Sequence, residues 1–512
     1  MTLNSGLDGR SPALKERVAG EEESSDEGAE LQPYLYYESP HAPAADAPRI
    51  LLVSHAFPPD PEVGGLRWQK MARYFGEQGW EFDVLTRDFR HSSRLDRARL
   101  DELPPGTRIF CVPAALPLML RIQKTILGAL RRARSPQGRH SGDASPEGTS
   151  APNDVERKPG SLARAYFAAA LFMREAKWAR AVARFGARLT SEREYRIVIS
   201  SGPPHLAHEG ARLIARSSGL PYLVDMRDPW SLVQRVVDEI ASPVWYILAR
   251  HFERRVVRES ALLVMNTERS RDAMRAAYPR YANKIEAIRN GCDDEALPPP
   301  RRGTRFSIRF AGSIYIDRDP RLLFRAAARV IATLGLEPGQ FAIEFIGDVD
   351  RYAGTPTMQI AREEGVERYV SLGGLLKREA ALEFLAGASV LLSLPQDSDF
   401  AIPAKIYEYL RFDAWMLVLA HEHSATAQLL RDVDADVLEP EDVDGMARAI
   451  QRRYEQFTRG ESPKSPASDG RFGRRAQAEK LIRLVSRIVN GDLGRGLPGR
   501  APSAAGDQLL RS

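Results

Sequence analysis

Residues 49–67 read Arg-Ile-Leu-Leu-Val-Ser-His-Ala-Phe-Pro-Pro-Asp-Pro-Glu-Val-Gly-Gly-Leu-Arg and predict a strand, a loop and a helix in succession. The apolar run 50–53 is typical of a buried strand, and a helix is expected from about residue 66. Between them, Gly64 and Gly65 let backbone N–H groups approach a ligand, and a helix N-terminus adds partial positive charge. The pattern favours an anion-binding loop, although a simple turn has the same composition.

The 512 residues have room for two domains, each with its own core. Apolar residues make up 43% of the chain and charged residues 28%, as in ordinary globular proteins. No apolar run is long enough to span a bilayer, and residues 1–19 lack the pattern of a secretory signal. We therefore expect a cytoplasmic protein.

The two cysteines, Cys111 and Cys292, fit a reducing compartment and form no metal-ligand spacing. The charge is unevenly distributed along the chain. Residues 1–48 carry ten acidic and three basic side chains, whereas residues 121–190 carry fourteen basic and five acidic ones. The basic segment suits an anionic membrane surface or partner, and a solvated helix face explains it equally well.

Short apolar runs alternate with helical periodicity, which predicts an α/β fold with two doubly wound, Rossmann-like domains facing a cleft. Strands are expected at 50–53, 82–85, 108–112, 196–200, 221–225, 261–265, 306–311, 341–346, 369–372, 389–394, 415–419 and 435–438. In the first half, helices are expected at 66–78, 205–217 and 268–277.

The domain organisation follows from these patterns and from composition. Residues 1–48 are expected to be a disordered acidic tail, and residues 492–512 a second tail. The first domain is expected at 49–298, with a low-complexity insertion at about 135–160, and the second at 299–491. Three consecutive prolines, 298–300, suit a stiff hinge between the domains.

Two motifs follow predicted strands of the first domain. His205 closes the motif Ser201-Gly-Pro-Pro-His205, where it is suited to be a general base or to cap the next helix. In Asp225-Met-Arg-Asp-Pro-Trp230, Asp225 and Asp228 bracket Arg227. This second group favours either a salt-bridged brace of the loop or a role in substrate binding and catalysis.

The second domain has a cationic group at equivalent positions. Gly312 ends a predicted strand, and Arg318 follows on a loop where it could clamp a diphosphate. Lys405 and Glu408 lie three residues apart at the start of a predicted helix behind Pro403. An ammonium for phosphate beside a carboxylate for ribose is suited to a nucleotide, although a plain surface ion pair has the same spacing.

With these motifs, residues 49–490 resemble family 4-type glycosyltransferases of the GT-B fold, which are retaining, nucleotide-sugar-dependent enzymes of bacterial polysaccharide assembly. The resemblance rests on the loop ending at Gly64-Gly65, the two motifs of the first domain, Asn290-Gly291, and Ile402-Pro-Ala-Lys-Ile-Tyr-Glu-Tyr-Leu410. It implies a nucleotide-diphosphate sugar donor and a hexosyl-type transferase.

The resemblance also implies roles for individual residues. Gly64 and Gly65 would meet the donor phosphates and the acceptor, Arg318 would replace a phosphate-binding lysine, and Glu408 would bind the ribose. The sequence departs from the family pattern in three places. Phe400 occupies the position of a first glutamate, so Asp399 is the nearest substitute for sugar contacts; Ser313 replaces a frequent arginine; and the family's histidine aligns nearer Ser201 than His205.

The expected reaction transfers a sugar to a glycan or lipid-linked acceptor without a metal or other cofactor, because cations and backbone donors can stabilise the leaving diphosphate. Residues 116–132 and 163–173 combine apolar and basic side chains, as interfacial helices do, and also suit a lid on the first domain. Peripheral binding at the inner face of the cell membrane is therefore one expectation. The alternatives are a sugar-nucleotide 2-epimerase of the same fold and a non-catalytic nucleotide-sugar-binding scaffold. Nucleic-acid binding is not expected.

Overall fold

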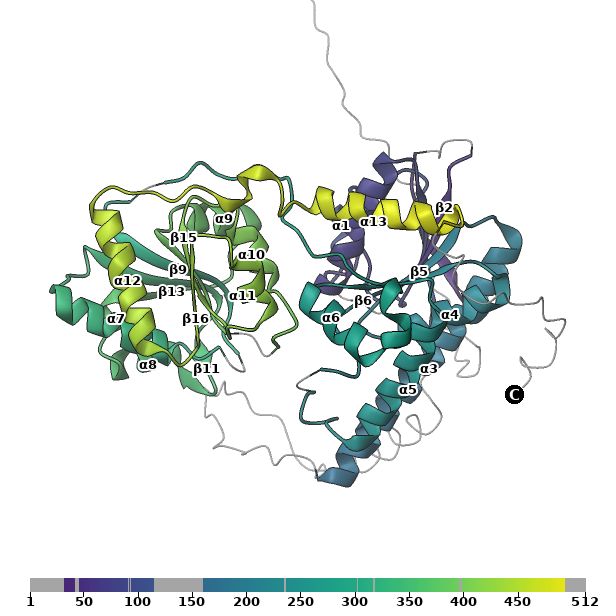
Figure 1. The fold of residues 1–512 in the computed structure, drawn as a ribbon, viewed down its shortest axis with the longest axis horizontal. Helices are drawn as coiled ribbons and strands as arrows, with labels where there is room; N and C mark the ends of the chain where they lie inside the picture. The colour runs from purple at the N-terminus through teal and green to yellow at the C-terminus, as the bar shows by residue number, and fades with distance from the viewer. Residues whose placement is uncertain are drawn as a thin grey trace, which may run out of the picture.

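The computed structural model describes residues 32–41, 46–90, 92, 94–114, 160–233, 236–301, 303–315, 318–395 and 398–492. It consists of two α/β domains side by side, each built on one twisted sheet covered by helices (Figure 1). The expected fold class, two doubly wound Rossmann-like domains, is confirmed.

The first domain contains an eight-stranded sheet of order β1-β4-β3-β2-β5-β6-β7-β8, in which every pair is parallel except β1 with β4. Strands β3, β4, β5 and β7 are buried along their whole length, as expected when helices cover both faces of a parallel sheet. The strands are β1 (Tyr34–Glu38), β2 (Arg49–Ser54), β3 (Glu81–Thr86), β4 (Arg108–Cys111), β5 (Ile197–Ser201), β6 (Tyr222–Arg227), β7 (Leu262–Met265) and β8 (Ile285–Ala287).

Strand β1 corrects the expectation of a disordered tail over residues 1–48. It pairs antiparallel with β4 at the edge of the sheet, and the Tyr34 hydroxyl donates a hydrogen bond of 2.8 Å to Asp88. The acidic composition of the tail as a whole concealed this short aromatic segment, which gains its partner only from a strand about 75 residues later. Residues 1–31 and 42–45 lie outside the described part of the chain.

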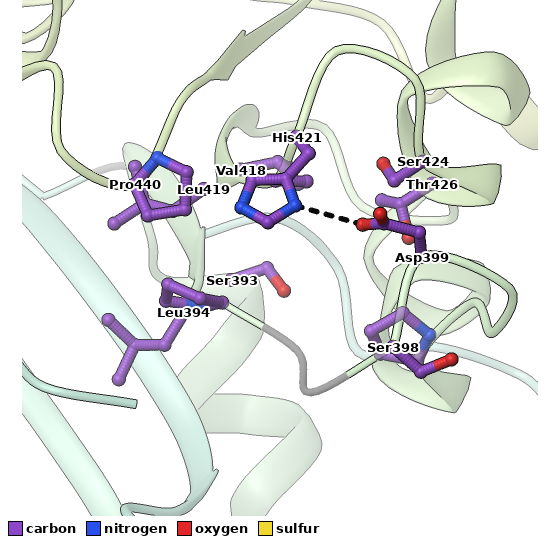
Figure 2. Close-up of a pocket in the computed structure, with 13 residues that line it drawn as sticks. Ser393, Leu394, Ser398, Asp399, Val418, Leu419, His421, Ser424, Thr426 and Pro440 are labelled. Carbon is purple, nitrogen blue, oxygen red and sulfur yellow. Dashed lines mark hydrogen bonds and ion pairs between the residues drawn. The ribbon is translucent and has the colours of Figure 1, made fainter. Parts of the chain in front are cut away.

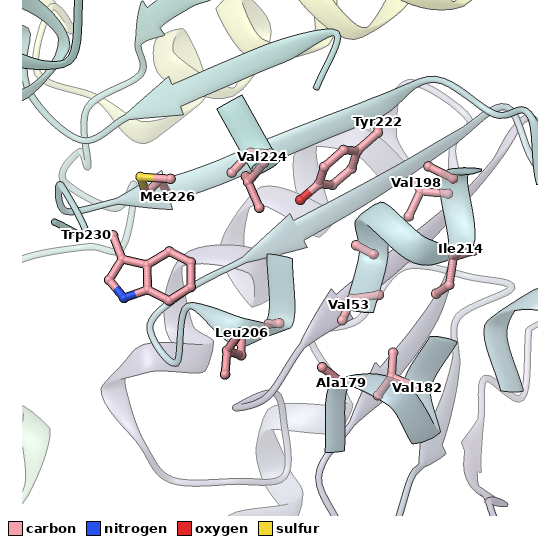
Figure 3. Packing of buried hydrophobic residues seen from close by; sticks show 14 of the residues in the cluster. Val53, Ala179, Val182, Val198, Leu206, Ile214, Tyr222, Val224, Met226 and Trp230 are labelled. Carbon is pink, nitrogen blue, oxygen red and sulfur yellow. The ribbon is translucent and has the colours of Figure 1, made fainter. Parts of the chain in front are cut away.

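Helices cover both faces of the first sheet. One face packs against α3, α4 and α5, where Val182, Ile214 and Val224 belong to the same buried cluster (Figure 3). The other face packs against α1 and α13. The helices of this domain are α1 (Leu66–Glu77), α3 (Ser161–Glu192), α4 (Leu206–Ser218), α5 (Pro243–Glu259) and α6 (Glu268–Ala277), with 3-10 turns at η1 (Val63–Gly65), η2 (Arg97–Leu100) and η3 (Pro279–Lys284).

The second domain has a six-stranded, all-parallel sheet of order β13-β10-β9-β14-β15-β16 and a small β11-β12 hairpin. Its strands are β9 (Phe306–Ser313), β10 (Phe341–Asp348), β11 (Arg351–Tyr352), β12 (Thr355–Pro356), β13 (Val370–Gly373), β14 (Val390–Ser393), β15 (Trp415–Leu419) and β16 (Ala435–Leu438). Its helices are α7 (Arg321–Leu334), α8 (Thr357–Glu363), α9 (Arg378–Ala386), α10 (Ala404–Tyr409), α11 (Ala425–Leu430) and α12 (Val443–Thr458), with 3-10 turns at η4 (Glu367–Tyr369) and η5 (Pro466–Asp469).

The last described helix, α13 (Arg474–Val489), returns to the first domain and lies beside α1 (Figure 1). The expected boundary, which placed 299–491 in one domain, is therefore wrong at its C-terminal end. The returning chain also contacts the outgoing one: the Arg474 amide donates to the Cys292 carbonyl and the Cys292 amide to the Phe472 carbonyl, both at 2.9 Å. Two chain segments thus cross between the domains at one place.

The insertion expected at 135–160 and the tail expected at 492–512 lie outside the described residues, apart from their end residues 160 and 492. Among the described residues, none of the helices combines the length and the apolar composition that a membrane span requires.

Candidate active site

A cavity of about 520 Å³ lies between the two domains, within the size range of small-molecule sites. Both domains contribute to its wall, since α10 belongs to the second domain and the ends of β6 and β7 to the first. The lining residues are Glu62, Gly64, Leu66, Arg67, Pro203, Pro204, Arg227, Asp228, Asn266, Asn290, Gly291, Ala404, Tyr407 and Arg474. Sequence reasoning placed Gly64, Arg227 and Asp228 in the site, and the structure brings these three together.

Two polar atoms in this wall lack a partner. The side-chain oxygen of Asn266 and the hydroxyl of Tyr407 are buried, and neither has a hydrogen-bond partner among the described residues. Burial raises the pKa of the Tyr407 hydroxyl, so it remains a proton donor at neutral pH. Because buried polar groups normally have partners, one acceptor and one donor facing the same cavity indicate a polar ligand or ordered water there.

Arg227 fixes the first-domain loops that border the cavity. Its guanidinium donates to the carbonyl of Gly64 at 2.9 Å, to that of Pro203 at 3.1 Å and to that of Gly202. Arg227 itself has a φ of 61°, an uncommon conformation for a residue other than glycine. Its hydrogen bonds bring the Gly64 loop and the 202–204 loop together, which is a positioning role.

Asp225 forms its ion pair with Arg67, whereas the brace, one of the two alternatives for this motif, placed it beside Arg227. Asp225 accepts from two nitrogens of Arg67, at 3.0 and 3.1 Å, and from the indole of Trp68 at 2.7 Å. The Arg67 guanidinium also donates to the side chain of Asn290 at 3.0 Å and to the carbonyl of Ile288 at 2.9 Å. This buried ion pair ties the start of α1 to β6 and to the segment that leaves the domain.

His205 is set back from the cavity. Its ring stacks on Trp230, with centroids 5.0 Å apart, and lies 5.6 Å from the ring of His208. Burial, with contributions from His208 and Arg227, lowers the pKa of His205 well below its usual value, so the ring is neutral at neutral pH. His205 is not among the residues that line the described cavity, so a role as general base stays a prediction.

Gly64 and Gly65 differ in the space around them. A Cβ on Gly65 would lie 3.0 Å from the Ala56 carbonyl oxygen and from the Phe57 Cα, which are backbone atoms that cannot turn aside. A Cβ on Gly64 would meet the Ala56 side chain at 3.6 Å, an ordinary contact. Packing therefore requires glycine at residue 65. Gly64 has room beside it and lines the cavity, where it can face a ligand.

We therefore expect Gly65→Ala to displace the loop and lower the unfolding free energy by about 1–3 kcal/mol, the usual cost of overpacking. Gly64→Ala is the matched control and should leave the unfolding free energy unchanged or raise it by less than about 1 kcal/mol, because its Cβ meets only ordinary contacts and the unfolded chain loses entropy. Chemical denaturation of both variants tests this difference. Equal destabilisation would contradict the packing account of Gly65.

The second domain brings its expected cationic residues together. The ammonium of Lys405 lies over the ring of Phe310 at 3.9 Å from its centroid. A Cβ on Gly312, whose φ is 151°, would come within 2.9 Å of the same ammonium. The Arg318 guanidinium donates to the Ser313 carbonyl at 3.0 Å and lies over the ring of Tyr315. Gly312, Arg318 and Lys405 thus form one group at the carboxyl end of β9.

Glu408 does not form the ordinary surface pair with Lys405. Its carboxylate pairs with Arg378 at 2.5 Å, and Arg378 also pairs with Glu295 of the segment that joins the domains. The Glu408 side chain keeps about a fifth of its surface exposed. Arg378 therefore holds the carboxylate that we assign to the ribose, and a ligand at Glu408 competes with an existing ion pair.

Burial and, to a smaller extent, the charge of Arg318 lower the pKa of Lys405 to about 7, although Glu408 opposes the change. A bound diphosphate would favour the charged form. We expect nucleoside-diphosphate binding at pH 8 to take up close to one proton, and binding at pH 6 to take up far fewer. Calorimetry in buffers of different ionisation enthalpy measures this uptake, and Lys405→Met should abolish it; the same uptake in that variant would contradict the assignment.

The lowered pKa of Lys405 also makes the stability of the ligand-free protein depend on pH. Between the folded pKa of about 7 and the ordinary lysine value of about 10.4, the unfolded chain binds a proton that folded Lys405 lacks. This group therefore makes the unfolding free energy increase with pH across that window.

Asp399, the expected substitute for sugar contacts, lines a second, much smaller cavity at the ends of β14 and β15 (Figure 2). One of its carboxylate oxygens lies 3.0 Å from His421 Nδ1. The cavity measures about 20 Å³, enough for a single water molecule but not for a sugar. A contact between Asp399 and a sugar stays a prediction. It would require the loop that carries Asp399 to move and widen this cavity.

The loop at Phe400 connects the domains directly. Its carbonyl accepts from Thr267 Oγ1 at 2.8 Å and from Ser270 Oγ at 3.1 Å, both at the start of α6 in the first domain. Arg269 lies over the Phe400 ring at 5.7 Å. The family pattern has a glutamate at the position of Phe400. In this chain, hydrogen bonds to the Phe400 carbonyl join the two domains instead.

Sequence reasoning assigned no role to several residues that matter in the site. Among them are Arg67, Asn266, Arg378 and Tyr407. Two carried a local signal, since Arg67 directly follows the Gly-Gly-Leu run and Tyr407 lies within the Lys405–Glu408 helix turn. The groups of His, Cys, Asp and Glu in the described residues include none with the arrangement of a metal site.

Several solved structures have a fold similar to that of this chain. The Anabaena protein HepE, solved with UDP-glucose, superposes with a TM-score of 0.52 at 13% identity over 86% of this chain and 99% of its own. Sucrose-phosphate synthase from Thermosynechococcus elongatus gives 0.56 at 13% identity, over 87% and 100%. The lipopolysaccharide outer core galactosyltransferase WaaB gives 0.50 at 11% identity, over 87% and 98%.

The chain has the GT-B fold. The similarity spans nearly the full length of these proteins, so it covers both domains. The sequence itself matches no protein-family model and no curated protein. Membership of family 4 within the GT-B enzymes therefore stays a prediction from the motifs.

Proposed function

We propose that this GT-B protein is a glycosyltransferase that takes a sugar from a nucleotide-diphosphate donor. One observation carries the proposal: Lys405, Arg318 and Gly312 form a cationic group in the second domain, and α10, which bears Lys405, also lines the cavity shared with the first domain. Open parallel sheets bind ligands at the carboxyl ends of their strands, where this group lies. HepE, solved with UDP-glucose, and the galactosyltransferase WaaB support the proposal through their shared fold.

The proposed roles follow from the charges. Lys405 and Arg318 would bind the diphosphate and stabilise its negative charge as the bond between the sugar and the phosphate oxygen breaks. Glu408 would bind the ribose hydroxyls after exchanging its partner Arg378. These groups supply positive charge without a metal ion, so we propose a reaction that needs no cofactor.

The acceptor would enter from the first domain. Glu62 and Asp228 are the two carboxylates among the residues that line the interdomain cavity, and Asp228 directly follows Arg227, which fixes the neighbouring loops. We propose that Asp228 binds the acceptor hydroxyl or takes its proton, which is the role expected of a carboxylate within reach of the reacting group. A glycan or lipid-linked acceptor and retention of configuration complete the proposal; both rest on the motif resemblance.

Turnover of nucleotide sugars tests the function. The full chain is incubated with UDP-, GDP-, ADP- and dTDP-sugars in the presence and absence of glycan acceptors, and nucleoside diphosphate and sugar products are quantified. We expect acceptor-dependent release of one nucleoside diphosphate. A sugar isomer formed without an acceptor would indicate the epimerase, and tight binding without turnover would indicate a scaffold, for which Phe400 and Ser313 at the expected ligand positions already provide a reason.

A further inference from the structure

A second large cavity lies between the domains, apart from the candidate active site. It measures about 500 Å³, within the size range of small-molecule sites. Its wall combines α6 of the first domain with Phe400 and part of the segment 422–431 of the second, and the described residues that line it differ from those of the candidate active site. Figure 1 shows α6 and α11 side by side between the domains, and we call this space the α6–α11 cavity.

Arg269, in the first turn of α6, lines the α6–α11 cavity without an anionic partner. Its Nε is buried and has no hydrogen-bond partner among the described residues, and its guanidinium lies over the Phe400 ring at 5.7 Å from the centroid. By contrast, Arg271 of the same helix pairs with Asp272 at 2.8 Å. Because buried polar groups normally have partners, Arg269 lacks an acceptor that a bound anion would supply.

The charges on the wall favour a ligand that has both an anionic group and hydroxyl groups. Arg431 also lines the cavity, and within the described residues neither Arg269 nor Arg431 is paired with a carboxylate. Two carboxylates line the cavity as well. Asp272 already pairs with Arg271, so in the described part of the chain Glu422 is the carboxylate that remains for a ligand.

Neither a simple anion nor a neutral sugar satisfies these three groups. A simple anion such as phosphate would be repelled by Glu422, and a neutral sugar would leave Arg269 and Arg431 without an anionic acceptor. A sugar that carries a phosphate or carboxylate group supplies the acceptor for the two guanidinium groups. Its hydroxyl groups would donate hydrogen bonds to the Glu422 carboxylate.

Two further side chains of the wall suit a sugar. Phe400 contributes apolar ring surface, and Gln428 contributes an amide that both donates and accepts hydrogen bonds, as hydroxyl groups do. Aromatic surface combined with a few polar groups is typical of small-molecule sites. These residues occupy the same wall as Arg269 and Arg431, so one molecule can contact both kinds of group.

We propose that the α6–α11 cavity binds an acidic sugar, that is, a sugar with a phosphate or carboxylate group. Arg269 and Arg431 would bind the anionic group, and Glu422 and Gln428 would bind hydroxyl groups. The site is separate from the proposed donor group at Lys405, so binding of an acidic sugar and binding of a nucleotide can each fail independently.

The position of the cavity links this binding to the arrangement of the domains. Beside the cavity, the Phe400 carbonyl of the second domain accepts hydrogen bonds from Thr267 and Ser270 of the first. A ligand that contacts α6 and the second domain together favours the arrangement in which these contacts are made. An acidic sugar would therefore stabilise the docked domains.

Calorimetric titration of the full chain tests the proposal, with glucose 6-phosphate, glucuronic acid, glucose and inorganic phosphate as probes. We expect at least one of the two acidic sugars to bind about tenfold or more tightly than glucose or phosphate, because only an acidic sugar engages both kinds of group. The same acidic sugar should raise the thermal midpoint of the protein.

Variants of the two arginines locate the binding. Arg269→Gln combined with Arg431→Gln should weaken it by about 100-fold or more, since each hydrogen bond to a charged group contributes about tenfold or more. Arg280→Gln combined with Arg448→Gln is the matched control, because it removes one exposed arginine of each domain outside the cavity. The control should change the affinity by less than about threefold. Circular dichroism verifies that both variants are folded.

Two further measurements separate this site from the donor site and identify the source of the ligand. Lys405→Met should leave the affinity for the acidic sugar unchanged, because Lys405 does not line the α6–α11 cavity. Incubation with a nucleotide sugar that supports turnover then distinguishes two sources. An acidic sugar that belongs to the acceptor is glycosylated, whereas an effector is recovered unchanged and alters the rate.

Three results would overturn the proposal. The first is no affinity for either acidic sugar. The second is binding that the Arg269 and Arg431 variant leaves unchanged or that Lys405→Met abolishes, which would assign the probe to another site. The third is inorganic phosphate binding as tightly as the acidic sugars, which would reduce the cavity to a simple anion site.

Discussion

Lys405→Met should weaken the binding of the cognate nucleoside diphosphate by about 10- to 100-fold while the protein stays folded. The expected size is that of one hydrogen bond to a charged group, about 1.5–3 kcal/mol. Lys405 suits this role because its ammonium lies beside Gly312 and over Phe310, and within the described part of the chain it has no ion-pair partner. Isothermal titration calorimetry of the variant against the wild type measures the change.

Lys464→Met provides the control for Lys405→Met, since Lys464 is an exposed lysine of the same domain. Its affinity for the nucleotide should equal that of the wild type. Removing the buried charge should also raise the unfolding free energy slightly at neutral pH, because burial is the main cause of the lowered pKa of Lys405. Unchanged affinity in Lys405→Met would exclude this residue from the donor site.

Arg67→Met should lower the unfolding free energy by about 3–5 kcal/mol, the typical cost of leaving one partner of a buried ion pair uncompensated. Arg67 is 4% exposed and Asp225 is fully buried, and the pair is supported by Trp68 and Asn290. Losing the guanidinium leaves the fully buried Asp225 carboxylate with fewer hydrogen-bond donors. Urea denaturation measures the effect.

Two companion variants separate the ion pair from the general loss of an arginine. Arg73→Met, on the same helix, removes an exposed arginine whose pair with Glu77 is long at 3.6 Å, and should change the unfolding free energy by less than about 0.5 kcal/mol. Arg67→Met combined with Asp225→Asn should be less destabilising than the two single changes added together. Strict additivity would show that the two side chains act independently.

Much of the fold could be predicted from the sequence because the strands of both sheets are buried on two faces. Such strands appear as continuous apolar runs, as in residues 50–53 and 415–419, and the structure places β2 and β15 there. Strand β1 escaped prediction because its pairing depends on β4. No helix was predicted at the position of α13, and its local pattern could not tell which domain it covers.

The residues of the candidate site likewise fall into those that local sequence patterns indicate and those that depend on contacts distant in the sequence. The structure brings Gly64, Arg227 and Asp228 to one cavity, because parallel strands end at one edge of the sheet and their following loops meet there. The pair of Arg67 and Asp225 joins residues 158 positions apart, so no local pattern indicates it. Long-range pairing likewise decided the partner of Glu408, which is Arg378 and not its helical neighbour.

The central claim is that the second domain binds a nucleoside diphosphate through Lys405, Arg318 and Glu408. Thermal unfolding of the full chain against a panel of nucleoside diphosphates tests it most directly. A ligand at 100 times its dissociation constant adds about 2.7 kcal/mol of stability, so one nucleoside diphosphate should raise the midpoint clearly, and the increase should be much smaller in Lys405→Met and in Glu408→Ala. A panel in which no nucleotide stabilises the wild type, or in which both variants respond as the wild type does, would contradict the donor site.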